Sequence, residues 1–212
     1  LELRRITWGA PADLLEKLIE YEAVHEIQSW TDLKNRLESD RRFYAFFHPS
    51  MHNEPLIFVE VALVKGIADN VQTLLDETQP IANAEDADTA IFYSISNAQP
   101  GLSGVSFGDF LIKKVVDHLS HELPNLKTFA TLSPIPGFRR WLDRRMADGA
   151  ELLNHEQEDA LAAVAGELPD DTDALPHLLD QPDWHQDEDI AGALNPVLMH
   201  LAAGYLLYQR RE

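Results

Sequence analysis

The sequence contains no cysteine among its 212 residues, which excludes a disulfide framework, a cysteine nucleophile and a cysteine metal site. It also lacks any uninterrupted apolar run near the roughly 20 residues that a membrane-spanning helix requires, and no basic or apolar leader opens it at Leu1. We therefore expect no membrane span, no secretion signal is visible, and we predict a cytoplasmic protein. The apolar fraction of 45% is ordinary for a chain that buries a core.

Lysine and arginine are missing from one long segment. Residues 151–190 hold 13 of the 36 acidic residues and no basic residue, within a chain of formal net charge −19. Nucleic acids are bound by basic surfaces, so this balance argues against a nucleic-acid partner. An anionic ligand would have to be attracted locally, for example by the run Arg139, Arg140, Arg144 and Arg145. A solvated helix face is the alternative interpretation of that run.

Hydrophobic periodicity predicts a mixed α/β core over residues 1–148 and an acidic helical extension over 149–212. The segment 55–64 is apolar at nearly every position, which is typical of a central strand covered on both faces. Lys17 is expected on the solvated side of the first helix. Predicted strands cover 42–48, 55–64, 89–96 and 127–133. Predicted helices cover 11–24, 30–39, 69–78, 107–122, 138–147, 151–166 and 190–209.

The predicted strand AIFYSISN, residues 90–97, has side chains for two faces. Period-two alternation predicts Ile91, Tyr93 and Ile95 on one face and Phe92, Ser94 and Ser96 on the other. Both faces are largely apolar, so this strand is also expected to be covered on both sides. The helix that follows carries one apolar stripe, formed by Phe107, Leu111, Val115 and Leu119.

A glycine-rich turn joins this strand to the helix over 107–122. Gly101, Gly104 and Gly108 let main-chain amides approach a ligand, and the positive end of the helix favours an anion such as a pyrophosphate. The turn matches neither the G-x-x-x-x-G-K-[ST] pattern of nucleotide-triphosphate loops nor the G-x-G-x-x-G pattern of dinucleotide folds. An ordinary tight connection is the alternative, because most glycines only supply turn conformations.

Ser133 is the nearest candidate for chemistry. It stands between the end of the strand 127–133 and a stiff Pro-Ile-Pro turn, in the segment SPIPGF. A hydroxyl held there can donate a hydrogen bond to a reacting oxygen. The alternative is that Ser133 only caps the helix near Phe138 or turns the chain into it.

Five stretches are more specific than any of these features alone: WGAPADLLEKLIEYEAVHEIQSWTDLKNRL (8–37), EPLIFVEVAL (54–63), AIFYSIS (90–96), GLSGVSFGDFLIKKVV (101–116) and LSPIPGF (132–138). In them the sequence resembles malonyl-CoA decarboxylases, with the tightest agreement between Glu54 and Trp141. The resemblance implies a fold like the Gcn5-related N-acetyltransferases, an α/β (α+β) fold in which a bulged mixed sheet flanked by helices and a glycine loop hold coenzyme A. The loop departs from the usual acetyltransferase pattern, since Ser106 stands at its middle glycine position.

The resemblance also implies roles for individual residues. The serine of SPIPGF, which is Ser133 here, is catalytic in that family. The implied reaction belongs to fatty acid metabolism and converts malonyl-CoA to acetyl-CoA and carbon dioxide, without a metal or an organic cofactor. The implied partners are malonyl-CoA or coenzyme A and further copies of the chain in a homo-oligomer. The segment implied to bind the phosphates of malonyl-CoA comprises Ser103, Gly104, Val105, Ser106, Phe107, Gly108 and Asp109.

Two parts of the family pattern are expected outside this chain. The family's second catalytic residue is a histidine in an N-P-x-x-x-F-H-like motif, and Asn195-Pro196 is followed by no such Phe-His pair. None of the nine histidines aligns with that residue, which is expected beyond Glu212. The family's N-terminal helical domain, which serves in oligomer assembly, is expected before Leu1. The chain is therefore expected to be part of a longer enzyme.

Two other functions stay open at this point. An acyl-CoA-dependent N-acetyltransferase would need an amine-acceptor site and an exposed general base. The other is a coenzyme A-binding module without activity, which is what a fragment lacking the histidine would be. Acetyl transfer to an amine would favour the first, and tight coenzyme A binding without turnover would favour the second.

Overall fold

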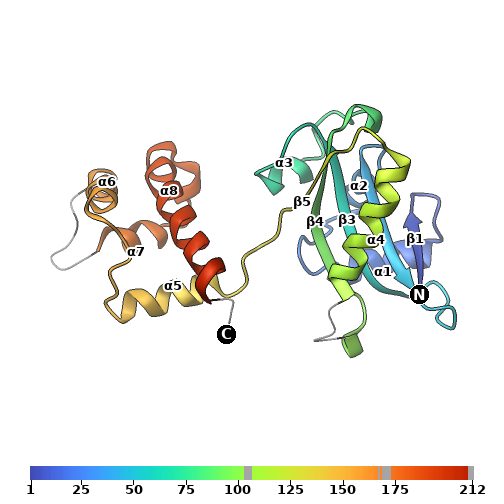
Figure 1. Ribbon diagram of the computed structural model, residues 1–212, viewed down its shortest axis with the longest axis horizontal. Helices are drawn as coiled ribbons and strands as arrows, with labels where there is room; N and C mark the ends of the chain where they lie inside the picture. Colours follow the sequence, from blue (N-terminus) through green and yellow to red (C-terminus); the bar gives the residue numbers. More distant parts are fainter. Residues whose placement is uncertain (103–106, 167, 169–172, 210–212) are drawn as a thin grey trace. The chain divides into compact units, whose positions relative to one another are not determined.

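A computed structural model describes the protein over residues 1–102, 107–166, 168 and 173–209 (Figure 1). The chain divides into two units, Leu1–Ser133 and Pro134–Glu212. The division falls before the boundary at residue 148 that the sequence predicts. The reason is that helix α5 (Phe138–Ala147) packs into the core of the second unit, where Leu142 is buried.

The first unit is built on a five-stranded sheet whose strands lie in sequence order. Neighbouring strands are antiparallel except for the last pair, which is parallel. β3 is the central strand and is buried along almost its whole length, as its apolar sequence predicts. The predicted mixed sheet flanked by helices is thus confirmed. The strands are β1 (Glu2–Ile6), β2 (Arg41–Phe47), β3 (Pro55–Val64), β4 (Thr89–Asn97) and β5 (Thr128–Thr131).

The edge strand β1 is not among the strands predicted from the sequence. Glu2, Arg4 and Arg5 are exposed, and only Ile6 at its end is buried, so no alternation of apolar residues marks this segment. Its extended conformation comes from antiparallel pairing with β2, which joins Glu2 to Phe47 and Ile6 to Phe43. Strand formation here depends on the partner strand more than on local propensity.

Helices cover both faces of the sheet, with α4 drawn in front of it in Figure 1. α4 (Phe107–Glu122) buries Leu111, Val115 and Leu119 against one face, and Phe107 packs at the margin, which confirms the predicted stripe. The opposite face packs against α1 (Ala12–Tyr21), α2 (Trp30–Arg36) and α3 (Val71–Leu75). Three short 3-10 helices complete the described structure, at Ala84–Asp86, Pro100–Leu102 and Trp184–Gln186.

β4 contains a β-bulge at Tyr93. Glu60 of β3 pairs with Ser94 and Val61 pairs with Phe92, so Tyr93 is the residue left over. One extra residue reverses the side-chain alternation beyond it. Ile95 therefore packs with the α4 cluster, whereas Tyr93 packs on the α3 face. The predicted division of residues 90–97 between two faces is wrong after Tyr93 for this reason.

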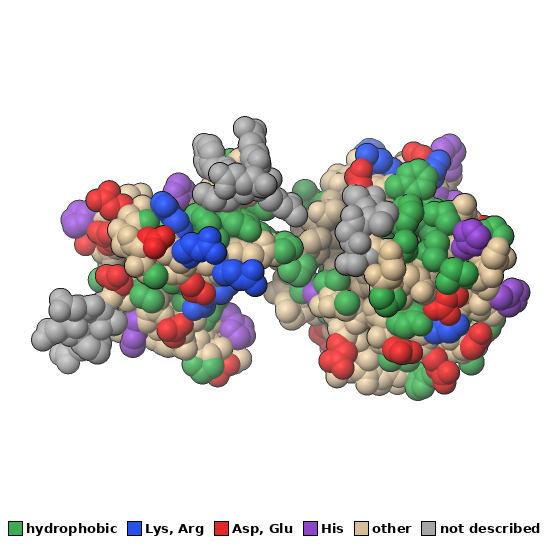
Figure 2. Space-filling model, turned by 90° about the horizontal axis from the view of Figure 1, so that it is seen from below, with side chains coloured by type: hydrophobic (Ala, Val, Ile, Leu, Met, Phe, Trp, Pro, Cys, Tyr) green, Lys and Arg blue, Asp and Glu red, His purple; other side chains and the backbone are tan. Residues whose placement is uncertain are grey.

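The second unit is helical. α6 begins after a capping box in which Asn154 Oδ1 accepts from Gln157 N at 2.9 Å and Gln157 Oε1 accepts from Asn154 N at 3.0 Å. The lysine and arginine side chains of this unit's described residues all belong to α5, and Figure 2 shows them gathered on one face. Its helices are α5, α6 (His155–Ala165), α7 (Ala174–Leu179) and α8 (Glu188–Gly204), which continues as a π-helical segment, Tyr205–Gln209.

One helical stretch of the described residues, Glu188–Leu207, is long and apolar enough to cross a membrane by length and composition alone. Its apolar residues also serve the second unit, because Leu194, Val197 and Leu201 are buried in that unit's core. Pro196 lies inside the helix, at a position flanked by these core residues. The apolar residues of this helix therefore contribute to the hydrophobic core of the second unit.

We predict that Leu119→Ala lowers the free energy of unfolding by about 2–5 kcal/mol, because the side chain is fully buried between α4 and the sheet and its removal leaves a cavity. Chemical denaturation followed by circular dichroism measures this. Asp117→Ala, on the exposed side of the same helix, is the matched control and should change stability by less than about 0.5 kcal/mol. Equal effects of the two substitutions would contradict the placement of α4.

Candidate functional site

β4 and β5 part where the bulge begins. Their parallel pairing runs from Thr89 with Thr128 to Phe92 with Thr131, and a last bond joins Leu132 N to Phe92 O at 2.9 Å. β4 then continues to Asn97 while the chain after β5 turns away. Because α4 connects these parallel strands, its N-terminus lies at the end of the sheet toward which both strands run. The open edge of β4 and the N-terminus of α4 thus belong to one end of the first unit.

Ser133 follows the last bond between these strands. Its side chain is exposed, and the next four residues are the turn Pro134-Ile135-Pro136-Gly137. Both prolines have a fixed φ, and the residues before them are restricted to extended conformations. The N-cap position of α5 is occupied by Gly137, so Ser133 does not cap this helix. Its position at a strand end, before a stiff turn, is the one that the sequence predicts.

The predicted phosphate-binding segment is described only in part. Ser103, Gly104, Val105 and Ser106 lie outside the described residues. Phe107, Gly108 and Asp109 form the first turn of α4. Gly108 lies directly over the sheet, since a Cβ added to it would lie 3.5 Å from Ile95 Cγ2. The first turn of α4 is therefore held close to the part of β4 beyond the bulge.

Asp109 places a negative charge in this first turn. Its carboxylate accepts a hydrogen bond from Lys113 Nζ at 2.7 Å, one helical turn further along. A carboxylate repels a phosphate, so only the main-chain N–H of Asp109 can contribute to anion binding. Lys113 offsets the charge of Asp109 and so favours that contribution.

A cavity of about 470 Å³ opens at the C-terminal end of β4, lined by Tyr21, Asn97, Ala98, Gln99 and Pro100. Two of these side chains contact Glu54, which accepts hydrogen bonds from Tyr21 Oη at 3.0 Å and Gln99 Nε2 at 2.8 Å.

Lys17 belongs to this cluster as well, with its Nζ 2.6 Å from Glu54 Oε2. The expectation that Lys17 is simply solvated is therefore wrong. Its hydrogen bond lowers the pKa of Glu54, and the hydrogen bond with Glu54 raises the pKa of Tyr21.

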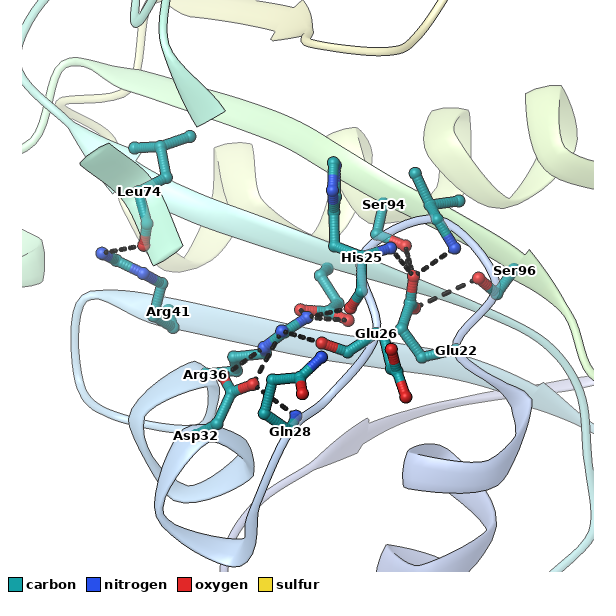
Figure 3. A network of polar contacts seen from close by, with 12 residues as sticks. Glu22, His25, Glu26, Gln28, Asp32, Arg36, Arg41, Leu74, Ser94 and Ser96 are labelled. Carbon is teal, nitrogen blue, oxygen red and sulfur yellow. Dashed lines mark hydrogen bonds and ion pairs between the residues drawn. The ribbon is translucent and has the colours of Figure 1, made fainter. Parts of the chain in front are cut away.

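A buried polar network lies beneath the bulge, on the face covered by α1 and α2 (Figure 3). Glu22, just after α1, accepts hydrogen bonds from Ser94 Oγ at 2.7 and 2.8 Å and from Ser96 Oγ at 3.1 Å. It also accepts from the main-chain N–H groups of Val24 and His25, each at 2.8 Å. One carboxylate thus joins the end of α1 to the part of β4 that lies beyond the bulge.

Arg36 forms the second half of this network. Its guanidinium binds Asp32 in a bidentate ion pair, with distances of 2.7 and 2.9 Å. It also donates to the carbonyl oxygens of His25 at 2.8 Å and Glu26 at 3.1 Å, which fixes the loop between α1 and α2. Burial favours the neutral form of Arg36, yet the hydrogen bond to Asp32 and the charge of Glu60 raise its pKa above the ordinary value.

Glu60 is the most deeply buried acid of this network. It lies in β3 opposite the bulge, with no exposed surface, and Arg36 Nη1 is 3.4 Å from both of its oxygens. Burial raises the pKa of Glu60 to about 8, although the charge of Arg36 opposes the shift. Burial, and then the charge of Glu60, raises the pKa of Tyr93 well above its usual value.

Glu22, Arg36 and Glu60 are not among the residues predicted from the sequence. Glu60 did carry a signal, because it is the one charged residue within the apolar run PLIFVEVALV, residues 55–64. A charge in a strand covered on both faces requires a buried partner. The identity of that partner depends on the chain fold, since Arg36 reaches Glu60 from a different element.

The comparisons with known proteins agree with one another. A family model described as the malonyl-CoA decarboxylase C-terminal domain matches residues 1–212. The chain belongs to this family. Relatives named "Malonyl-CoA decarboxylase, mitochondrial" are 39% identical in Anser anser anser over 218 residues and 40% identical in Rattus norvegicus over 220 residues. In both, the alignment covers 100% of this chain but only 43% and 44% of the relative.

Solved malonyl-CoA decarboxylase structures share the fold. The enzyme from Rhodopseudomonas palustris has a TM-score of 0.81 at 48% identity, over 96% of this chain and 46% of its own. The enzyme from Agrobacterium vitis has a TM-score of 0.81 at 46% identity, over 96% of this chain and 47% of its own. The chain thus spans under half the length of the decarboxylases that it matches. The predicted family is confirmed, whereas the roles of Ser133 and of residues 103–109 stay predictions.

We predict that stability falls with rising pH because of Glu60. Its pKa is about 8 in the folded chain against an ordinary value of 4.5, so between these pH values the unfolded chain has released a proton that the folded chain retains. The free energy of unfolding should fall across this window by up to about 1.4 kcal/mol per pH unit. Glu60→Gln removes this slope, which denaturant titrations between pH 5 and 9 would measure.

Glu54→Gln is the control of opposite sign. The pKa of Glu54 is lowered, so its stabilising effect is present above pH 4.5 and is lost as the pH falls through its folded-state pKa. Wild type and Glu60→Gln with the same pH slope between pH 5 and 8 would refute the assignment to Glu60.

Proposed function

We propose that this chain forms the substrate-binding part of a malonyl-CoA decarboxylase, which converts malonyl-CoA to acetyl-CoA and carbon dioxide. The family match across residues 1–212 carries this proposal. The arrangement of the first unit supports it, because Ser133 follows the point where β4 and β5 part. Such an opening leaves the edge of β4 accessible to an extended ligand that carries amide groups.

Coenzyme A binding is proposed at the N-terminus of α4. The segment Ser103 to Asp109 would cradle the phosphates, with main-chain N–H groups and the positive end of the 16-residue helix facing them. Gly108 supports this, because it places the first turn of α4 next to Ile95 of the sheet, in the part of β4 beyond the bulge. In a chain of net charge −19, such a local site is needed to hold an anionic thioester.

The chemistry follows from the substrate. Loss of carbon dioxide from the malonyl group leaves an enolate, whose charge the thioester carbonyl delocalises without a metal or an organic cofactor. Ser133 would donate a hydrogen bond to the malonyl group as this charge develops. A histidine from elsewhere in the full-length protein would then deliver the proton to carbon.

We infer a homo-oligomer for the full-length protein, and the expectation of a cytoplasmic location stays a prediction. The goose and rat relatives are named as mitochondrial proteins.

We predict that Ser133→Ala lowers kcat for malonyl-CoA decarboxylation by about 100-fold to 1,000-fold in the full-length natural protein, the usual effect of removing a hydrogen-bond donor to a developing oxyanion. Acetyl-CoA and carbon dioxide released from malonyl-CoA would be followed together. Ser120→Ala is the matched control, because Ser120 is exposed on α4 and, within the described part of the chain, bonds only the carbonyl of Val116 in its own helix. Unchanged turnover in Ser133→Ala, or transfer of an acetyl group to an amine in place of decarboxylation, would refute the proposal.

A further inference from the structure

An aromatic cluster in the second unit lies against the turn that follows Ser133. The rings of Phe138, Trp141 and Tyr205 pack together, with centroids 5.4 to 5.8 Å apart. Phe138 and Trp141 belong to the start of α5, while Tyr205 begins the π-helical segment after α8. This cluster brings the end of α8 to the beginning of α5.

Tyr205 also makes a polar contact with the turn. Its hydroxyl donates a hydrogen bond to the carbonyl oxygen of Pro136 at 2.8 Å. This bond fixes a peptide group of the turn from a residue 69 positions further along the chain. Phe138 N contributes a weaker bond of 3.3 Å to Ile135 O from within the turn.

Gly137 shows that the tyrosine and the turn fit each other closely. Its φ is +80°, a backbone conformation that residues other than glycine rarely adopt. A Cβ at this position would also lie 2.8 Å from the Tyr205 hydroxyl oxygen, which is closer than such atoms approach. The hydroxyl therefore occupies the space that the glycine leaves free.

A third notable feature of the contact between Tyr205 and the turn is the π-helical backbone that begins at Tyr205. π-helical turns are rare, and those that occur are frequently found at functional sites. Here the change from α-helix to π-helix begins at the residue that contacts Pro136.

We propose that Tyr205 is a positioning residue for the Ser133 hydroxyl, an inference that rests on the proposed function of Ser133. The chain from Ser133 to Pro136 contains two prolines and two residues that precede prolines, so few of its torsions are free. Fixing the peptide of Pro136 therefore restricts the orientation of Ser133. Tyr205 touches no reacting atom in this scheme and acts through the turn alone.

The first test is Tyr205→Phe in the full-length natural protein. This variant keeps the ring in the aromatic cluster and loses only the hydrogen bond to Pro136. We expect kcat for malonyl-CoA to fall by about 10-fold to 100-fold, as for a small misplacement of a catalytic group, with KM unchanged within about twofold. Tyr44→Phe is the matched control, since it removes a hydroxyl bonded to Glu122 at 3.3 Å in the first unit and should leave kcat unchanged.

Two double variants separate positioning from general damage. If Tyr205 acts through Ser133, Tyr205→Phe should lower the residual kcat of Ser133→Ala by less than twofold. Gly137→Ala should lower kcat more in the wild-type background than in Tyr205→Phe, where the clashing hydroxyl is absent. Should Tyr205→Phe fail to fold, Gly137→Ala alone tests the turn, with an expected loss of kcat at unchanged KM.

The outcomes distinguish the two proposals. If Ser133→Ala leaves turnover intact, the proposed role of Ser133 is wrong. If Ser133→Ala abolishes most turnover while Tyr205→Phe has wild-type kcat, only the positioning role of Tyr205 is overturned. Multiplicative losses in the Ser133→Ala, Tyr205→Phe double variant would likewise overturn it, because the two residues would then act independently.

Discussion

β4 contains one residue more than β3 can pair with, and the arrangement of the first unit depends on where that residue lies. With the extra residue at Tyr93, Ser94 and Ser96 turn to the face covered by α1 and α2, while Ile95 turns toward α4. The pairing of β4 with β5 ends at Phe92, immediately before the bulge. A continuous ladder along β4 would close the opening that precedes Ser133.

The buried network keeps the bulge in this register. A slip of one residue would take Ser94 and Ser96 away from Glu22 and leave this buried carboxylate with only its main-chain donors, which is costly. Arg36 and Asp32 supply a bidentate ion pair close by, and Arg36 also reaches the loop carbonyls of the α1–α2 connection. Buried ion pairs of this kind add little net stability. Here the pair links α2 to the loop after α1, because the same guanidinium binds both.

The sequence predicts those elements whose signal is local. The central strand 55–64, the helix 107–122 with its buried stripe, and the position of Ser133 before a proline turn all follow from apolar periodicity and proline geometry. The structure departs from the sequence analysis where distant residues decide. A bulge reverses the alternation in β4, the partner β2 makes a strand of β1, and Arg36 reaches Glu60 from another element. The anchoring of the SPIPGF turn by Tyr205 could not be predicted either, because 69 positions separate the bonded residues.

The charged edge strand β1 bears on how the protein behaves in concentrated solution. An edge strand offers unpaired main-chain groups to any extended chain that approaches, and this is the usual starting point of β-aggregation. Arg4 and Arg5 are both exposed on β1, and Arg5 Nη1 lies 3.3 Å from Glu122 at the end of α4. Strand addition at this edge would have to bring another chain alongside two guanidinium groups, which disfavours it. The exposed charges of β1 therefore protect this edge of the sheet from aggregation, although β1 is the strand with the weakest sequence signal.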